Sequence, residues 1–248
     1  MAGPPGAVGS ASIAQPRYWW YQARESLLRA ALSRYVGAPT RVLDVGSADG
    51  PSVRWLRGAG KLASLDIDPR GLAAGGVCGS ALALPFATGS FDVVAAFDVV
   101  EHCEPESTAI AELARVLVPG GRLLLSVPAY QWAWTHFDAD NGHHRRYTRR
   151  RAMAAVQAHG LTIERSTYAF MGTFPFFTAE RLLRRVRDRL SGRRGGELDP
   201  GEVPPLPPVP RPVERALMRL CRLDERLLPS RDLPFGSSVL VAARKPTA

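Results

Sequence analysis

Residues 41–50 have the sequence Arg41-Val42-Leu43-Asp44-Val45-Gly46-Ser47-Ala48-Asp49-Gly50. An apolar run stops abruptly here at residues that tolerate unusual backbone angles, which predicts a buried strand that leads into a tight glycine turn. Pro51, Trp55 and Leu56 predict a helix directly after the turn. Because such a turn exposes backbone N–H groups at the start of a helix, we expect a nucleotide-like cofactor to bind against it.

A second strand is predicted over residues 61–68, and it ends in acidic residues. Asp66 lies about 20 residues beyond the glycine turn, the spacing at which a carboxylate at the tip of the second strand accepts hydrogen bonds from both ribose hydroxyls. An acidic residue at a strand end is common on protein surfaces. The spacing to the glycine turn favours the ribose role for Asp66.

The chain continues as an alternation of strands and helices. Helices are predicted over 18–36, 107–117 and 150–159, and strands over 93–97, 122–127, 161–170 and 237–243. This alternation predicts an α/β fold with a mostly parallel sheet covered by helices on both faces. The ligand crevice is expected at the carboxyl ends of the strands, where Gly46, Asp66, Ser80 and Asp98 fall.

Composition divides the chain into three parts. Residues 1–16, rich in Gly, Ala, Pro and Ser, are expected to form a disordered leader. Residues 17–170 together with 230–248 make the expected cofactor-binding domain. Residues 171–229 form an insertion between the last two strands, with an Arg-rich helix over 180–190, a Pro-rich linker over 192–212 and an amphipathic helix over 213–228.

Charge and cysteine content restrict the environment of the protein. The formal net charge of +9 favours contact with phosphates, nucleic acid or an acidic membrane face, although a solvated basic surface explains it equally well. Cys78, Cys103 and Cys221 form no Cys-x-x-Cys pair and are expected to be reduced thiols. The chain contains neither an apolar run of about 20 residues nor a signal-peptide pattern, so we expect a cytoplasmic location.

Several sequence blocks, taken together and in order, resemble the class I S-adenosylmethionine-dependent methyltransferases. The blocks are Val42–Gly50, Leu65–Asp68, Leu84–Phe86 with Ser90–Val94, Asp98–His102 and Ala114–Pro128. Tyr18–Arg24 and Gly142–Thr148 resemble a bacterial subgroup associated with polysaccharide or secondary-metabolite pathways. The resemblance implies a Rossmann-like fold with a mostly parallel seven-stranded sheet and an antiparallel last strand, and S-adenosylmethionine as cofactor with S-adenosylhomocysteine as product.

The resemblance also assigns cofactor-binding residues. For the methionine part, it implies contacts with Gly46, Ser47, Ala48 and Gly50, a turn ordered by Asp44, and Asp98 near the amino group. For the nucleoside part, it implies that Asp66 holds the ribose and that the adenine is bordered by Ile67, Ser80 and Ala81. It also implies that Trp20 and Arg24 close over the site. The family usually has glycine at the position of Ala48 and a carboxylate at that of Ser80. We expect cofactor binding to survive these two departures, with a lower affinity.

The reaction implied is in-line attack of an acceptor on the sulfonium methyl, which the cofactor already activates. His102, His143 and Tyr130 are the candidate catalytic residues, with histidine as the base for a hydroxyl acceptor. The candidate substrate-binding residues lie in the polar loop between residues 128 and 151 and are Tyr130, Asp138, His143, Arg146 and Tyr147. A histidine packed at a helix start and a solvated loop are the structural alternatives.

We expect no metal ion. His136, Asp138, Asp140, His143 and His144 are potential ligands. However, residues 138–142 do not match a calcium loop, and zinc sites usually have more regular His or Cys spacing.

Other functions remain open at this stage. An NAD-dependent oxidoreductase is disfavoured because the turn lacks the helix-packing glycine of the dinucleotide motif. A tRNA or rRNA methyltransferase fits the charge, but residues 97–100 lack the Pro-Pro-aromatic element used on exocyclic amines, and Cys103 lacks a preceding proline. A non-catalytic partner subunit is the third alternative, with Ala48 and Ser80 as signs of decay.

The acceptor is therefore expected to be a hydroxyl, amine or carboxyl of a small, sugar-like or lipid-linked molecule. Phe174, Phe176 and Phe177 precede an arginine-rich segment, so the insertion is predicted to act as a lid, as a homodimer contact or as a peripheral contact with the inner membrane face.

Overall fold

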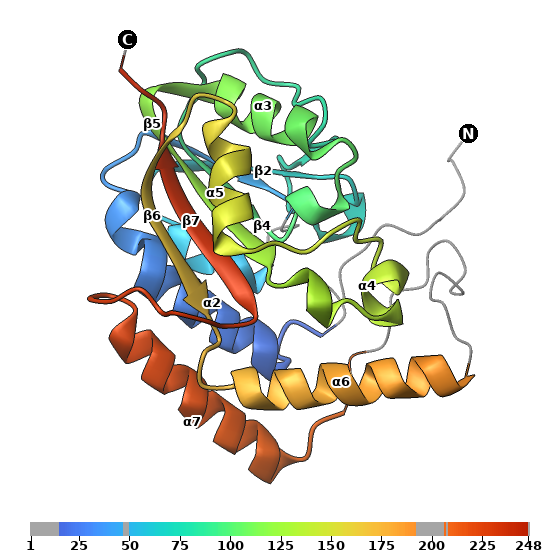
Figure 1. Cartoon of the computed structure of the whole chain (residues 1–248). Coiled ribbons are helices and arrows are strands. Elements are labelled where there is room, and N and C mark those ends of the chain that lie inside the picture. Colours follow the sequence, from blue (N-terminus) through green and yellow to red (C-terminus); the bar gives the residue numbers. More distant parts are fainter. Residues whose placement is uncertain (1–14, 47–49, 192–205, 207, 248) are drawn as a thin grey trace.

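The fold is built on a seven-stranded sheet, seen in a computed structural model that describes residues 15–46, 50–191, 206 and 208–247 (Figure 1). The strand order is β3-β2-β1-β4-β5-β7-β6. The strands are β1 (Arg41–Val45), β2 (Lys61–Asp66), β3 (Val77–Cys78), β4 (Phe91–Phe97), β5 (Leu117–Pro128), β6 (Thr162–Ala169) and β7 (Ser238–Arg244). β7 pairs antiparallel with both β5 and β6. The predicted α/β class and the antiparallel last strand are confirmed.

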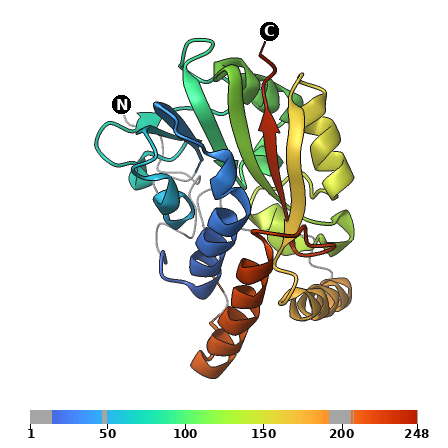
Figure 2. The same ribbon diagram turned by 90° about the vertical axis from the view of Figure 1, so that its left-hand side faces the viewer.

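Helices cover both faces of the sheet. They are α2 (Trp19–Leu32), α3 (Glu106–Val116), α4 (His136–Asp140), α5 (Arg149–Gln157), α6 (Phe174–Ser191) and α7 (Arg211–Leu227). α2 and α7 pack together on one face, and α3 and α5 lie on the other (Figure 2). Because both faces are covered, the central strand β4 is apolar and largely buried along its length rather than alternating.

The order of the strands reverses at β1. This strand pairs in parallel with β2 on one side and with β4 on the other, so that Val45 lies between Leu65 and Ala96. Connections from the two neighbouring strands leave in opposite directions at such a switch point, which opens a crevice at the carboxyl ends of the strands. The fold therefore places a ligand site where the glycine turn follows β1.

The structure adds detail to two local predictions. The predicted helix after the glycine turn is a short 3₁₀ helix, η2 (Pro51–Leu56). The chain must reach β2 at Lys61, which leaves room for only one short element. The predicted polar loop after β5 also contains the short helix α4, at whose start the backbone N–H of Thr135 donates to Asp138 Oδ2 at 2.9 Å.

The insertion is helical at both ends. α6 begins at Phe174, so the apolar segment expected to lead into the helix belongs to its first turns. α7 begins at Arg211 and packs on α2 (Figure 2). Two predictions, the disordered leader and the Pro-rich linker, fall largely on residues 1–14, 192–205 and 207, which lie outside the described residues.

Candidate cofactor and acceptor site

The glycine turn at the end of β1 requires glycine at residue 46. Gly46 has a φ of 79°, and its N–H donates to Leu65 O at 2.7 Å. A Cβ atom on this residue would lie 2.4 Å from Val99 Cγ2, which is far too close. The glycine turn thus packs directly against Val99, in the segment that follows β4. Asp44 is fully buried in β1, whereas Ser47 and Ala48 lie outside the described residues.

Asp66 is held at the tip of β2. Its Oδ1 accepts a hydrogen bond from the Asp68 N–H at 2.9 Å, and its backbone carbonyl accepts one from Gly79 at 2.9 Å. Ile67 follows with 54% of its surface exposed, which is unusual for an isoleucine beside a core strand. Ser80 and Ala81 lie beyond β3, and Ser80 Oγ accepts from the Leu82 N–H at 3.1 Å.

Arg24 of α2 is tied to the ends of β4 and β5. Its Nη2 lies 2.9 Å from Asp98 Oδ2 and 3.0 Å from Ser126 Oγ, and its Nη1 lies 2.5 Å from Ser52 Oγ. Ser126 in turn donates to Asp98 Oδ1 at 2.7 Å. Arg24 is 7% exposed, so α2 is anchored to the site by a buried, charged hydrogen-bond network.

Asp98 and Trp20 complete this side of the site. Asp98 follows β4 with a φ of 58°, a conformation that is disfavoured for non-glycine residues and that clusters at functional sites. The Trp20 ring stacks on Phe170 with a centroid distance of 5.8 Å, and the Arg24 guanidinium lies 5.3 Å from the Trp20 ring. Trp20 and Arg24 therefore lie next to each other at the ends of β4 and β6.

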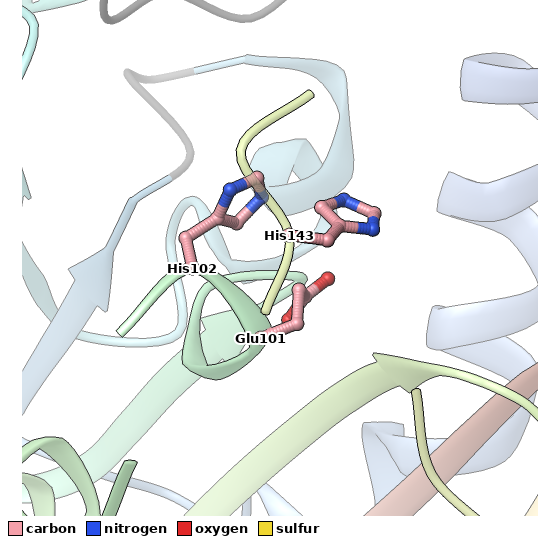
Figure 3. Close-up of side chains that lie close together, drawn as sticks. All are labelled: Glu101, His102 and His143. Atoms are coloured by element: carbon pink, nitrogen blue, oxygen red, sulfur yellow. The ribbon is translucent and has the colours of Figure 1, made fainter. Parts of the chain in front are cut away.

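Glu101, His102 and His143 form a second group next to Asp98, which we call the Glu–His–His cluster. Glu101 and His102 belong to the turn η4 (Val100–His102) that follows β4, and His143 comes from the loop after α4 (Figure 3). The two imidazole rings stand at 84° to each other with centroids 4.6 Å apart. One ligand atom from each of the three side chains lies within 4.8 Å of the other two.

The charge states in this cluster follow from burial. Burial and the neighbouring Asp98 charge raise the pKa of the Glu101 carboxyl well above its usual range. Among the described residues, neither Glu101 oxygen has a hydrogen-bond partner. Surrounding protein atoms and the adjacent His143 ring lower the pKa of His102 to about 4, although this side chain keeps exposed surface. His102 is therefore neutral at pH 7 and accessible to a ligand.

Asp138 links the polar loop between residues 128 and 151, which we call the acceptor loop, to α6. It is fully buried and accepts from Arg146 Nε at 2.7 Å, from Arg181 Nη1 at 3.3 Å and from His143 Nδ1 at 3.3 Å. Burial alone would raise the pKa of Asp138, but the His143 hydrogen bond and the two arginine charges hold it below its usual range. Asp138 and Arg146 are thus engaged with each other inside the protein.

The two candidate tyrosines lie in different environments. Tyr130 has a φ of 62° and stacks on Tyr168 with centroids 5.3 Å apart, and burial together with Tyr168 raises its pKa. Tyr147 is 1% exposed, and its hydroxyl donates to Glu106. A phenol as deeply buried as that of Tyr147 does not contact a substrate in this conformation. Its burial depends on the folding of the whole loop, which the sequence alone does not show.

Sequence reasoning gave no role to Glu101 or Ser126. Glu101 lies in the block Asp98–His102, but its burial depends on the loop that carries His143 and folds over the end of β4. The backbone N–H of His144 donates to Glu101 O at 2.8 Å and fixes this approach. Of the five residues weighed as metal ligands, Asp138 and His143 contact each other at 3.3 Å, while His136 pairs with Asp188 at 2.6 Å.

No helix in the described part of the chain is long and apolar enough to cross a membrane.

Comparison with known proteins places these features in a family. Residues 43–125 match the family described as "Methyltransferase domain". An uncharacterized methyltransferase from Mycobacterium sp. (strain JLS) is 31% identical over 176 residues, which cover 60% of this chain and 69% of that protein. A demethylmenaquinone methyltransferase from Mycolicibacterium vanbaalenii is 33% identical over 121 residues, which cover 46% of this chain and 50% of that protein. The chain thus spans about half the length of the latter relative.

Solved structures share the fold over most of the chain. The [4+2]-cyclase SpnF superimposes with a TM-score of 0.57 at 21% identity, over 94% of this chain and 84% of that one. Such a likeness concerns the fold alone. Three findings point to the same family: the strand order, the position of the glycine turn, Asp66 and Asp98 at one edge of the sheet, and the sequence matches. The chain belongs to the class I S-adenosylmethionine-dependent methyltransferases.

Proposed function

We propose that the protein transfers the methyl group of S-adenosylmethionine to a nucleophilic atom of a small molecule. The observation that carries this proposal is the meeting of Gly46, Asp66 and Asp98 at the carboxyl ends of β1, β2 and β4, at the switch point of the sheet. The family relationship supports the cofactor. The bound sulfonium supplies an activated methyl, so the protein mainly has to position the acceptor.

The residues around the switch point suit the parts of this cofactor. The Asp66 carboxylate is proposed to bind the ribose hydroxyls, and the exposed Ile67, with Ser80 and Ala81, to border the adenine. The Arg24–Asp98 pair offers one cationic and one anionic group side by side, which suits the carboxylate and the ammonium of the methionine part. Trp20 beside Arg24 is proposed to shield this end from water.

The acceptor is proposed to be a hydroxyl, amine or carboxyl compound, sugar-like or lipid-linked, bound between the Glu–His–His cluster and Tyr130. His102 with a pKa near 4 is a weak general base at pH 7, because an efficient base has a pKa close to the working pH. His143, held by Asp138, is the better oriented of the two proposed histidine bases. A pathway for polysaccharide or secondary-metabolite synthesis fits such an acceptor.

The exposed face of α6 supports a peripheral contact with an anionic membrane as part of the same proposal. Phe176, Leu183 and Leu190 are 61%, 59% and 83% exposed on a helix that is rich in arginine. This surface would bring a cytoplasmic enzyme to a lipid-linked acceptor. A homodimer contact through α6 is the competing explanation, and sedimentation with anionic vesicles at low and high salt distinguishes the two.

Calorimetric titration of the purified chain with S-adenosylmethionine and S-adenosylhomocysteine tests the central proposal. We expect saturable binding of one molecule per chain. Asp66→Asn should weaken it by about 10-fold or more, because a charge-assisted hydrogen bond is lost. Asp68→Asn is the matched control, since the Asp68 carboxylate pairs with Arg70 at 2.6 Å. Absence of binding by the wild-type chain would overturn the proposal.

Mass spectrometry of a panel of acceptors incubated with the cofactor then tests the substrate class. An added methyl group on a hydroxyl compound would support the acceptor proposed here. Transfer to tRNA or rRNA with steeply salt-dependent binding would instead support the nucleic-acid alternative. Cofactor binding without transfer to any compound would favour a non-catalytic partner subunit.

A further inference from the structure

The Glu–His–His cluster combines the ligand types of a transition-metal site. One carboxylate and two imidazoles converge from two segments that are far apart in the sequence (Figure 3). Imidazole nitrogens suit zinc and the later first-row metals, whereas magnesium prefers oxygen alone. At metal–ligand distances of about 2.1 Å, ligand atoms in a tetrahedral site lie about 3.4 Å apart. The present limit of 4.8 Å therefore requires only small side-chain movements to close around an ion.

Glu101 supplies the second, independent observation. Its side chain is fully buried, and both carboxylate oxygens lack a hydrogen-bond partner among the described residues. A buried carboxyl group without partners is costly, so such groups are expected to be paired or to coordinate a metal. The nearest arginines are already engaged, because Arg24 pairs with Asp98 and Arg146 with Asp138. A bound cation would satisfy the oxygens of Glu101.

Each imidazole has one ring nitrogen engaged with the protein, as metal-binding histidines usually do. His143 uses Nδ1 to contact the Asp138 carboxylate at 3.3 Å, which leaves Nε2 for a ligand. Asp138 is itself fixed by Arg146 and Arg181, so it resembles the outer carboxylate that orients a metal-bound histidine. His102 makes a hydrogen bond with the Gly142 backbone, which leaves its other ring nitrogen available. Its exposed surface gives an ion access to the cluster.

We propose that Glu101, His102 and His143 bind one divalent transition-metal ion, of which Zn²⁺ is the best representative. Three protein ligands leave a position open on a four-coordinate ion. The cluster immediately follows Asp98 at the end of β4, so an ion held by it would lie close to the place where the methyl donor is proposed to bind. The structure thereby assigns the acceptor class: an oxygen acceptor whose hydroxyl binds the metal. This second step rests on the proposed function.

The chemistry balances without any further reactant. A metal-bound hydroxyl has a lowered pKa and releases its proton to water or buffer. The oxygen lone pair then forms the new C–O bond to the methyl carbon. The C–S bond breaks with its electron pair remaining on sulfur, which converts the sulfonium into a neutral thioether. The metal changes neither its charge nor its protein ligands. In this arrangement His143 binds the metal, and this role replaces its proposed role as the base.

The experiment uses the tag-free full chain after treatment with a chelator. Titration with ZnCl₂ should show one tight site per chain and raise the unfolding temperature, and Co²⁺ should give a visible absorption band typical of bound nitrogen ligands. MgCl₂ should compete poorly. Glu101→Gln and His143→Ala should each weaken Zn²⁺ binding by at least about 100-fold, and Asp138→Asn by about 10-fold. His159→Ala, which removes a histidine just beyond the end of α5, should leave Zn²⁺ binding unchanged.

Cofactor binding by the same samples separates the two proposals. If S-adenosylhomocysteine binds to the wild-type chain and Zn²⁺ does not, the metal inference fails and the proposed function stands. If Zn²⁺ binds and S-adenosylhomocysteine does not, the proposed function fails and the metal site stands. Zn²⁺ binding that survives in both Glu101→Gln and His143→Ala would also overturn the inference. Should either variant fail to fold, two other measurements test the inference. The Co²⁺ band should be lost from the His102→Ala chain, and Zn²⁺ should raise the unfolding temperature of the wild type; absence of both effects would overturn the inference.

Discussion

Arg24 Nη2 and Asp98 Oδ2 lie 2.9 Å apart and join helix α2 to the end of strand β4. The sequence predicts that Asp98 lies near the methionine amino group of the cofactor and that Arg24 closes over the site with Trp20. Arg24 and Asp98 are therefore not two isolated charges. They belong to one buried network that also includes Ser52 and Ser126 and that is already aligned by hydrogen bonds. Preorganisation of this kind reduces the cost of binding a zwitterion.

Asp98→Asn should weaken S-adenosylmethionine binding by about 10-fold or more, because the charge that is proposed to hold the ammonium group is lost. Asp92→Asn is the matched control. Asp92 lies at the other end of the same strand, where its Oδ2 accepts from the backbone N–H groups of Thr40 and Arg41. Equal affinities of Asp98→Asn and wild type in calorimetry would contradict the assignment of Asp98.

Gly46→Ala should abolish cofactor binding. The added Cβ would lie 2.4 Å from Val99 Cγ2, so the glycine turn or the chain after β4 has to move. Gly58→Ala is the control, because Gly58 also has a positive φ, of 85°, but has no atom within 4 Å of the added Cβ. Both variants carry the backbone penalty of about 1–2 kcal/mol, and only the first carries the clash. Similar binding by the two would show that contact with Val99 is unimportant.

Arg165→Met should destabilise the fold by about 3 kcal/mol or more. The guanidinium donates to the carbonyls of Ala31, Leu228 and Arg231, which close the ends of α2 and α7. Each buried carbonyl left without a donor costs about 1–3 kcal/mol. Arg122→Met, which breaks a more exposed pair with Glu164, should cost about 1 kcal/mol or less. Urea unfolding measures both, and equal losses would contradict the assigned role.

Asp224→Asn should stabilise the protein increasingly as the pH rises from about 4 to 7. Burial raises the pKa of Asp224 above its usual 3.8. The folded state therefore holds this proton more tightly than the unfolded state, and wild-type stability is lost as the pH rises from the unfolded pKa through the folded one. Asparagine cannot ionise and keeps an acceptor for the Gly172 N–H, which donates to Asp224 at 3.0 Å.

The measurement for Asp224 is the difference in unfolding free energy between variant and wild type at several pH values. Asp232→Asn provides the control, because the Asp232 side chain is 50% exposed. A difference for Asp224→Asn that stays constant with pH would contradict the prediction.

The sequence predicted what depends on local spacing. Patterns within a few tens of residues predict the strand before Gly46, the acidic residue Asp66 at the end of the second strand, and the alternation of strands and helices. The structure contains the predicted sheet. The burial of Tyr147 and the isolation of Glu101 could not be predicted in this way. Both depend on how the loop after β5 folds back over η4, and this long-range packing leaves no periodic signal in the chain.

The length of η2 is a second example. Pro51 and the apolar residues after it favour helix, but a pattern of six residues does not distinguish a 3₁₀ turn from the first turn of an α-helix. The short 3₁₀ helix forms in the segment between β1 and the start of β2 at Lys61.

Asp138 has a consequence for how the sequence can change. It binds His143 of the acceptor loop and Arg181 of α6 through the same buried carboxylate. A shorter side chain at residue 181 would leave Asp138 with one donor fewer and would shift the imidazole that it orients. The surface helix and the acceptor loop are therefore constrained to evolve together, so exchange of α6 between relatives should succeed only when the loop is exchanged with it.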